Sequence, residues 1–547
     1  MSQSPPPPGR SSGAGTTVLL VVLVILLVAV GGFAGLLVWR GSAQPRAAGS
    51  GPRVAQAPPS PTTPSPAQSP GSSSTDRGSM PAVPAGLARF YHQRLRWHAC
   101  GTNRCASLTV PLDYAHPGGR TIELAVLDVP ARDQRHKLGA LVVNPGGPGG
   151  SGVQYAAAAP VVLGTVLPTW FDIVGFDPRG VGQSTPLRCA STAELDHFVA
   201  SDPDPDTAAE RRQMDREVHR LGEGCLHDSG ALARHMSTVE VARDMDVLRA
   251  ALHEPKLDYF GASYGTFLGA TYANLFPHRV GRMVLDGAIN PALSNEQLSL
   301  QQAHGFEVAL RSYVADCVHS GSCFLGSTVD QGTRRIRQFL HRVEAHPLPT
   351  DTSRRLTAGT AMLGIWMPLY VRSYWPQLSA GLQQAMQQGS GSKLLSLADM
   401  YTSRGPNGYL DNSLEVLYDV NCLDHDDAIP TSQVPSHFAE FLKASPTFGK
   451  AFAFSLSTCS AWPIHTGNAS HALHAKGAPP IVVIGTTRDP ATPLEWARAL
   501  ARQLDSGVLV TRNGDGHTGF HQGNPCVDHA VQGYLVHGKV PRNGLAC

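Results

Sequence analysis

The pentapeptide Gly261-Ala262-Ser263-Tyr264-Gly265 constrains the fold of this chain more than any other feature of its sequence. Residues 256–260 before it have the pattern of a short strand, and residues 266–276 after it that of a helix ending before Pro277. A serine among small residues between a strand and a helix predicts a sharp turn that raises its hydroxyl above the end of a sheet. The five-residue pattern alone is weak in a chain with 56 glycines, so its value depends on partners elsewhere.

Apolar runs alternate with helical patterns through much of the chain. Strands are expected over 121–129, 139–144, 171–177, 282–287, 480–485 and 507–511, and helices over 238–252 and 494–504. Continuous apolar strands separated by helices indicate a mostly parallel sheet with helices on both faces. Together with the serine turn, this alternation predicts the α/β class and, within it, the α/β-hydrolase fold.

One interval, 290–430, breaks this alternation, because its periodicity is mostly helical. A helical insertion between two sheet strands predicts a lid over the strand ends, between a first core segment (89–289) and a second (431–547). Trp366, Tyr370, Tyr374 and Trp375 lie in the middle of the insertion. We expect these aromatic residues to form the core of the lid rather than substrate contacts.

The N-terminal region has a different character. Residues 17–39 form an unbroken apolar run, long enough to cross a bilayer of about 30 Å, which predicts a transmembrane signal-anchor with residues 1–16 as a cytoplasmic tail. A cleaved signal peptide is the alternative, since Gly41-Ser42-Ala43 could serve as the cleavage site. Residues 40–88 are rich in Pro, Ser and Gly and have few large apolar side chains, so we expect a disordered tether.

Charge and cysteine content limit the possible functions. The net charge of +2 gives no support for a nucleic-acid partner. All ten cysteines follow the tether, which favours disulfides in an oxidising compartment, and no C-x-x-C metal motif occurs. Pairing in chain order is one of many connectivities and gives Cys100–Cys105, Cys189–Cys225, Cys317–Cys323, Cys422–Cys459 and Cys526–Cys547. We expect no metal and no cofactor.

Two later loops offer partners for Ser263. Asp489 follows the expected strand 480–485, and His517 follows the expected strand 507–511 in a glycine-rich loop. The chain order serine, acid, histidine is that of an α/β-hydrolase triad, in which a base must activate the serine. Asp515 is the rival acid, but it is too close to His517 in sequence to reach its ring comfortably.

The glycine-rich run 144–152 follows another buried strand and suits an oxyanion hole. The expected donors are the backbone amides of Tyr264 and of Gly147, with Gly146 as the alternative to Gly147. A phosphate-binding loop is excluded, because the run lacks the Lys-Ser/Thr of a P-loop and does not fit G-x-G-x-x-G.

These motifs, together with the run Gly175-Phe176-Asp177-Pro178-Arg179-Gly180-Val181-Gly182-Gln183-Ser184, resemble the secreted tripeptidyl aminopeptidases of actinobacteria. That family belongs to the prolyl aminopeptidase-like branch of the α/β-hydrolases. The resemblance covers about residues 90–547, including a C-terminal segment similar to the characteristic C-terminal region of the family. It implies an exported enzyme with a helical lid that releases short peptides from free N-termini through an acyl-enzyme. The apolar N-terminus and tether depart from the family pattern.

An enzyme that requires a free N-terminus needs a carboxylate to bind the ammonium group. Asp424 and Glu240 are the candidates, although either could be an ordinary solvated or helix-capping acid. The expected partners are peptides, and the membrane through residues 17–39. A carboxylesterase with the same triad is the alternative function, and a surface binding protein on an inactive hydrolase fold is the alternative of another class.

Overall fold

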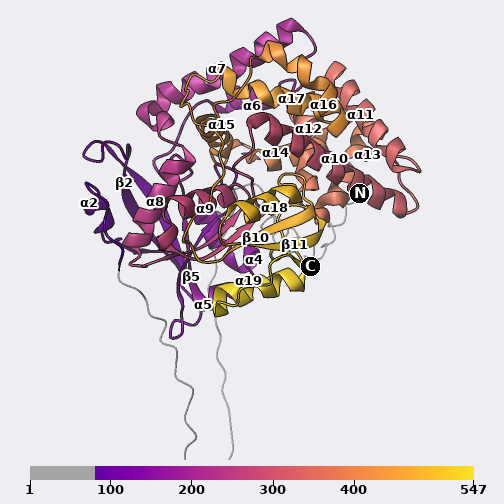
Figure 1. The fold of residues 1–547 in the computed structure, drawn as a ribbon. Coiled ribbons are helices and arrows are strands. Elements are labelled where there is room, and N and C mark those ends of the chain that lie inside the picture. Colours follow the sequence, from indigo (N-terminus) through magenta and orange to yellow (C-terminus); the bar gives the residue numbers. More distant parts are fainter. Residues whose placement is uncertain (1–79) are drawn as a thin grey trace, which may run out of the picture.

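The computed structural model describes residues 80–547, and within them the chain forms a ten-stranded mixed sheet (Figure 1). The strand order is β1-β2-β3-β5-β4-β6-β7-β10-β11-β12. The pairs from β1 to β5 are antiparallel, whereas all neighbouring pairs from β5 to β12 are parallel. The strands are β1 (His98–Cys100), β2 (Asn103–Pro111), β3 (Thr121–Val129), β4 (Gly139–Asn144), β5 (Phe171–Phe176), β6 (Leu257–Ala262), β7 (Val280–Asp286), β10 (Ile481–Arg488), β11 (Gly507–Asp515) and β12 (Leu545–Ala546).

Successive residues of the central strands supply two separate apolar cores, one on each face of the sheet. Val142 and Met283 join the core of one face, while Leu141 and Val284 join that of the other, as the two-residue period of a strand requires. The first core also contains residues of α8 (Thr238–Ala251), α9 (Tyr264–Leu275) and α18 (Leu494–Gln503). The second contains residues of α3 (Gly152–Ala157), α4 (Ala159–Val162), α5 (Leu167–Trp170) and α19 (Pro525–His537). The predicted α/β-hydrolase fold with helices on both faces is confirmed.

Further elements lie on the same face of the sheet as the first core. They are α2 (Ala88–Tyr91), α6 (Thr192–Ala200), α7 (Ala208–Ser229), η1 (Gly230–Arg234), η2 (Pro277–Arg279), the hairpin β8 (Arg404–Gly405) with β9 (Gly408–Tyr409), and α15 (Ser413–Asp424). Leu195 of α6, Val218 of α7 and Val416 of α15 are buried in the first core. Thus α15, although it lies within the predicted lid interval, packs with the sheet helices.

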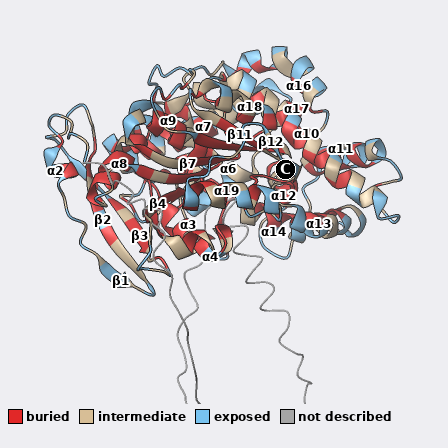
Figure 2. Ribbon diagram, turned by 60° about the horizontal axis from the view of Figure 1, so that its bottom comes forward, coloured by how far each residue is buried: buried red, intermediate tan, exposed pale blue. Residues whose placement is uncertain are grey.

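A third core belongs to a helical layer formed by the part of the chain that follows β7 and precedes β10 in the sequence (Figure 1). Its elements are α10 (Asn295–His319), α11 (Val329–Ala345), α12 (Ala358–Leu369), η3 (Arg372–Tyr374), α13 (Trp375–Gln388), α14 (Ser392–Tyr401), η4 (Thr431–His437), α16 (Phe438–Ala444), α17 (Gly449–Phe454) and η5 (Ser455–Ser460). The layer therefore continues beyond residue 430, where the sequence placed its end. The cause is packing: Phe441 and Phe452 are buried in the helical core rather than against the sheet. Figure 2 shows this buried interior in red, with exposed residues at the rim of the layer.

Five disulfides join the ten cysteines in the order of the chain, as expected: Cys100–Cys105, Cys189–Cys225, Cys317–Cys323, Cys422–Cys459 and Cys526–Cys547. The predicted tail (1–16) and signal-anchor (17–39), and most of the tether (40–88), lie outside the described residues. No helix between residues 80 and 547 combines the length and apolarity needed to span a bilayer.

Candidate active site

Ser263 lies in the turn between β6 and α9, at φ 55° and ψ −126°. A positive φ is strained for a residue with a side chain, and such strain is found mainly at functional sites. Gly146 packs against this turn so closely that a Cβ there would lie 2.5 Å from the carbonyl oxygen of Ala262. Ser263 itself is only partly buried, so its hydroxyl remains accessible.

The loops after β10 and β11 bring Asp489 and His517 into contact. Nδ1 of His517 is 2.9 Å from both carboxylate oxygens of Asp489, and the two residues are 6% and 2% exposed. The backbone amides of Ala491, Thr492 and Thr518 also donate to Asp489, as does the Thr492 hydroxyl. Asp489 is therefore held in one orientation by donors on both loops. Asp515 instead pairs with Arg488, at 2.6 Å.

The contact with Asp489 leaves one imidazole nitrogen of His517 unpaired. In the described part of the chain, the buried Nε2 has no hydrogen-bond partner, and the Ser263 hydroxyl likewise makes no hydrogen bond. Catalytic hydrogen bonds are often loose without substrate and tighten in the reacting complex. With Nδ1 facing a carboxylate, Nε2 is the nitrogen that can accept a proton.

Asp286, at the end of β7, joins the serine turn to the histidine loop. Its backbone carbonyl accepts the amide of Ser263 at 2.9 Å. Its carboxylate accepts the amides of Gly519 and Phe520, at 2.7 and 2.8 Å. The neighbouring Gly287 lies against His517, since a Cβ on this glycine would be 3.1 Å from Cε1 of the ring. Ser263 and His517 are thus attached to the same end of one strand.

The charges around His517 favour its protonated form. Burial by itself lowers the pKa of His517, but the charge and hydrogen bond of Asp489, with the charge of Asp286, outweigh it and raise the pKa above the ordinary value. Burial also raises the pKa of Asp286, to about 6, against the opposing effect of the Phe520 and Gly519 amides. The environment therefore stabilises an imidazolium, the species that forms when histidine takes a proton from serine.

Two amides point to an oxyanion hole beside Ser263. Tyr264 is the first residue of α9, so its amide has no acceptor within the helix. The amide of Gly146 is occupied, because it donates to the Asn144 side chain at 2.9 Å. Within residues 80–547 the Gly147 amide donates no hydrogen bond, which favours Gly147 over Gly146 as the second donor.

Asp424 lies behind Tyr264 rather than in a substrate cavity. Its carboxylate accepts the amide and the hydroxyl of Thr238, at 2.9 and 2.5 Å, and the Thr238 hydroxyl in turn bonds the phenol of Tyr264. Desolvation raises the pKa of Asp424 to about 7, although both bonds from Thr238 lower it. The carboxylate therefore supports the residue whose amide faces the candidate oxyanion.

Glu240 also has protein partners. Its carboxylate pairs with His235 at 3.0 Å and with Arg179 at 3.4 Å. Asp113, His235 and Glu240 have ligand atoms within 4.8 Å of one another, the one group of this kind found among residues 80–547. Asp113 also contacts His116, at 2.7 Å, and Glu240 pairs with the Arg179 guanidinium, so both carboxylates already have protein partners.

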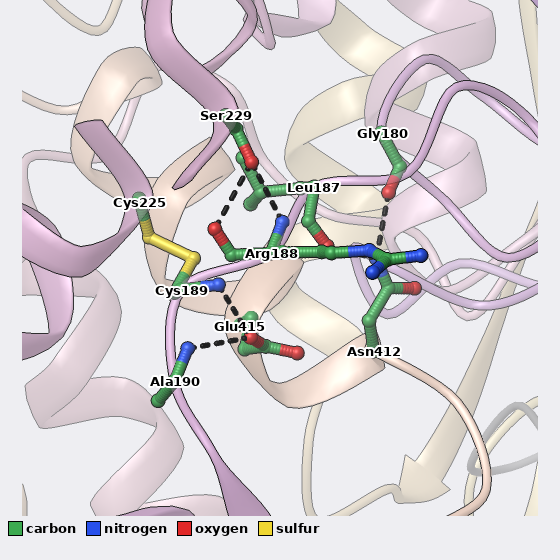
Figure 3. Close-up of a disulfide and its surroundings, with 9 residues drawn as sticks. All are labelled: Gly180, Leu187, Arg188, Cys189, Ala190, Cys225, Ser229, Asn412 and Glu415. Atoms are coloured by element: carbon green, nitrogen blue, oxygen red, sulfur yellow. Dashed lines mark hydrogen bonds between the residues drawn. A yellow bond between two sulfur atoms is a disulfide. The ribbon is translucent and has the colours of Figure 1, made fainter. Parts of the chain in front are cut away.

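The start of α15 holds the loops that follow β5 (Figure 3). Glu415 accepts the amides of Cys189 and Ala190, next to the Cys189–Cys225 disulfide, and the Asn412 side chain donates to the carbonyl of Gly180. A Cβ on Gly149 would lie 2.6 Å from the Ser413 carbonyl oxygen, so α15 also abuts the glycine-rich loop. One end of α15 therefore contacts the oxyanion loop, and Asp424 at the other end reaches Tyr264 through Thr238.

A cavity of about 350 Å³ lies between this site and the helical layer. Gly147, Pro148 and Tyr264 form its end at the oxyanion loop. Trp366 and Tyr370 line it, whereas Tyr374 and Trp375 are buried in the helical core, so the expectation of lid-core residues applies to only part of this aromatic group. Neither Asp424 nor Glu240 lines the cavity, so the structure does not bring these two candidates to the substrate space.

Residues 445–547 match a family model described as TAP-like protein. Over 459 residues the chain is 37% identical to "Serine protease Hip1" of Mycobacterium tuberculosis (strain ATCC 25618 / H37Rv), an alignment that covers 81% of this chain and 87% of that protein. The chain is a TAP-like α/β-hydrolase. This TAP-like hydrolase is also 39% identical to "Carboxylesterase B" of Mycobacterium tuberculosis (strain CDC 1551 / Oshkosh), covering 82% of this chain and 86% of that one. It is 30% identical to "Tripeptidyl aminopeptidase" of Streptomyces lividans, covering 84% and 88%. The TAP-like chain is a serine hydrolase.

Several residues of this TAP-like site were not found from the sequence. Thr492 contacts both members of the histidine–aspartate pair, its hydroxyl lying 3.2 Å from Nδ1 of His517. Tyr370 accepts the His517 amide through its backbone carbonyl, at 2.8 Å. Asp286 could have been suspected, because it ends an expected strand, but Tyr370 and Thr238 carry no sequence signal of their position.

Proposed function

We propose that Ser263, His517 and Asp489 are the catalytic triad of this serine hydrolase, and that the amides of Gly147 and Tyr264 form the oxyanion hole. One observation carries the proposal. Nδ1 of His517 contacts both oxygens of Asp489 at 2.9 Å, while the buried Nε2 has no partner among residues 80–547. Asp286 joins the strained turn of Ser263 and the His517 loop to the same strand end.

In this mechanism, Nε2 of His517 takes the proton from the Ser263 hydroxyl as its oxygen attacks the substrate carbonyl carbon. Asp489 fixes the tautomer and stabilises the imidazolium. The two amides bind the oxyanion of the tetrahedral intermediate. His517 then protonates the leaving group, and a water molecule repeats the sequence to release the acyl group and regenerate Ser263.

The proposed substrates are peptides with a free N-terminus, from which the enzyme releases a tripeptide. The resemblance to the relative named "Tripeptidyl aminopeptidase" supports this choice. Ester hydrolysis is the second candidate, favoured by the relative named "Carboxylesterase B". Matched peptides with a free or an acetylated N-terminus separate the two, because only an aminopeptidase loses activity when the amine is blocked.

We further propose that the helical layer acts as a lid and that the catalytic part faces an oxidising compartment outside the cytoplasm. The five disulfides within residues 80–547 support the second statement, since such bonds persist mainly where thiols are not kept reduced. Attachment through residues 17–39, or secretion after their cleavage, remains a proposal. N-terminal sequencing of the mature protein distinguishes them.

The decisive variant is Ser263→Ala. We expect hydrolysis of peptides and esters to fall by at least about 10⁴-fold while the thermal unfolding temperature changes little, because the nucleophile is lost and the packing is kept. A fluorophosphonate probe should label the wild type at Ser263 and leave the variant unlabelled. Turnover by Ser263→Ala close to that of the wild type would exclude this triad, and an unlabelled, inactive wild type would favour a binding protein.

A further inference from the structure

The cavity beside the candidate triad extends from the oxyanion loop to a residue that contacts His517. At one end it is formed by the oxyanion loop residues Gly147 and Pro148. It is also lined by Tyr370, whose ring meets that of His517 edge-on, with 5.5 Å between the ring centroids. A group attached to the carbonyl that Ser263 attacks would therefore enter this space directly. The acyl part of a substrate occupies it in both steps, because it remains bonded to the serine after the leaving group has gone.

Aromatic side chains form one large part of the walls of this cavity. Phe306, Trp366 and Phe452 line it as one cluster, with ring centroids 5.0 Å apart for the first pair and 4.9 Å for the second. Phe267 and Tyr418 line it from the α9 and α15 side. Aromatic rings already packed against one another form a pre-shaped surface that excludes water from an apolar group.

The same walls carry no charge. None of the described residues that line the cavity is Asp, Glu, Lys or Arg. His425 is the histidine among them, and burial lowers its pKa, which favours the neutral ring. Of the polar lining residues, Gln302 already donates to the Ala491 carbonyl at 2.9 Å. A charged group placed in this space would lose its hydration and find no ion of opposite sign.

We propose that this cavity is the subsite for the substrate residue that supplies the scissile carbonyl, and that it selects an uncharged aromatic or branched aliphatic side chain there. The inference rests on the proposed role of Ser263. It also disfavours release of single amino acids, because their ammonium group would lie beside the carbonyl inside an uncharged space. In a released tripeptide the ammonium lies two residues, or about 7 Å, farther along an extended chain, where it can leave the cavity.

The test uses the full chain and tripeptide p-nitroanilides of the form Gly-Gly-X, where X is Phe, Leu, Lys or Glu. For the wild type we expect kcat/KM to be at least tenfold, and up to about 10³-fold, higher for Phe and Leu than for Lys and Glu. p-Nitrophenyl esters of 3-phenylpropanoic, 6-aminohexanoic and glutaric acids repeat the comparison without a peptide bond. Equal rates for charged and uncharged acyl groups in both series would overturn the proposal.

Asn421→Asp provides a gain-of-function test, because Asn421 lines the cavity and its side chain has no hydrogen-bond partner among residues 80–547. We expect this isosteric carboxylate to raise kcat/KM for X = Lys at least tenfold relative to Phe and to lower it further for X = Glu. Gln433→Glu adds the same charge at an exposed position and is expected to leave the preference unchanged. If neither variant alters the ratio of Lys to Phe, Asn421 does not face the bound side chain and the subsite is wrong.

Failure of the proposed function gives a different result. If no peptide is cleaved but the esters are, the peptidase assignment fails, and the ester series still tests the cavity. If neither series is cleaved and the fluorophosphonate probe does not label Ser263, the triad assignment fails, and with it the subsite.

Discussion

His517 is the residue whose surroundings make the most direct kinetic prediction. It acts as a base only when neutral, and its pKa is raised because Asp489 and Asp286 outweigh the effect of burial. Activity should therefore be lost on acidification at a higher pH than for an ordinary histidine of pKa about 6.5. The acid limb of kcat/KM against pH, measured on a neutral peptide, checks this, and a limb below pH 6 would contradict it.

Asp489→Asn is the matched variant for this prediction. Removing the carboxylate charge should lower the apparent pKa of His517 and, by no longer fixing the tautomer, reduce kcat by about 10⁴-fold. A variant that retains the acid limb of the wild type would show that another group controls the pH dependence.

Asp424 predicts a pH effect of the opposite kind, on stability rather than on rate. Burial raises its pKa from the ordinary carboxyl range to about 7, so the folded state holds its proton more tightly than the unfolded state does. The stability from this group is complete below about pH 4 and is lost as the pH rises through about 7. Relative to the wild type, Asp424→Asn should therefore gain free energy of unfolding between pH 4 and 7, as urea unfolding would show.

Asp424→Ala separates this effect from support of the oxyanion hole. Asparagine can still bond the Thr238 amide and hydroxyl, whereas alanine leaves Thr238 and the Tyr264 phenol without their anchor. We expect Asp424→Ala to lower kcat about 10-fold or more with little change in KM, and Asp424→Asn to retain most of kcat. Equal kcat for the two variants would show that Asp424 does not support the Tyr264 amide in catalysis.

The role of Asp424 also illustrates how far single residues could be predicted. Ser263, Asp489 and His517 follow strands in a fixed chain order, so the sequence alone was enough to propose them. Asp424 was a candidate for the ammonium group because such an enzyme needs a carboxylate there. Its actual partner Thr238 lies 186 residues away in the chain, so nothing in the local sequence indicated this contact. A contact between distant segments leaves no local pattern in either of them.

At the scale of elements, α15 is the clearest case of one helix that serves several parts of the site. The Cys422–Cys459 disulfide fastens it to η5, and both cysteines line the cavity. Replacing both by serine should lower the free energy of unfolding by about 2–4 kcal/mol and raise KM several-fold, because the cavity wall loosens. Urea unfolding and KM for a neutral peptide measure the two effects.

The Cys526–Cys547 bond is the control for this prediction, because it ties α19 to the chain end and lines no part of the cavity. Its removal should lower stability by a comparable amount and leave KM unchanged. If the pair Cys422 and Cys459 could be removed without a change in KM, α15 would not shape the substrate space.

Elements with strong periodicity were predicted well, and those defined by packing were not. The central strands were evident from their continuous apolar runs, since burial on both faces leaves no polar alternation. β1 and β2 were missed, because His98–Cys100 is short and β2 mixes exposed and buried residues. The end of the helical layer was placed at 430 because sequence periodicity does not reveal which core a helix joins.

At the scale of the whole molecule, the described residues form three apolar cores with different positions. Two fix the sheet and hence the positions of the strand ends that carry Ser263, Asp286 and Asp489. The third closes the helical layer on itself, and residues of that layer line the cavity. Residues of the third core thus form one side of the cavity, whereas Phe267 and Tyr418, which pack against the first core, form another.

The contribution of the helical layer to the cavity has a consequence for how related enzymes change their substrate preference. Substitutions among the helical-layer residues that line the cavity change its shape while keeping the apolar contacts that hold the central strands. We therefore expect related enzymes with other substrate preferences to differ first in α10, α12 and α17, whose residues line the cavity, and to keep the same catalytic residues.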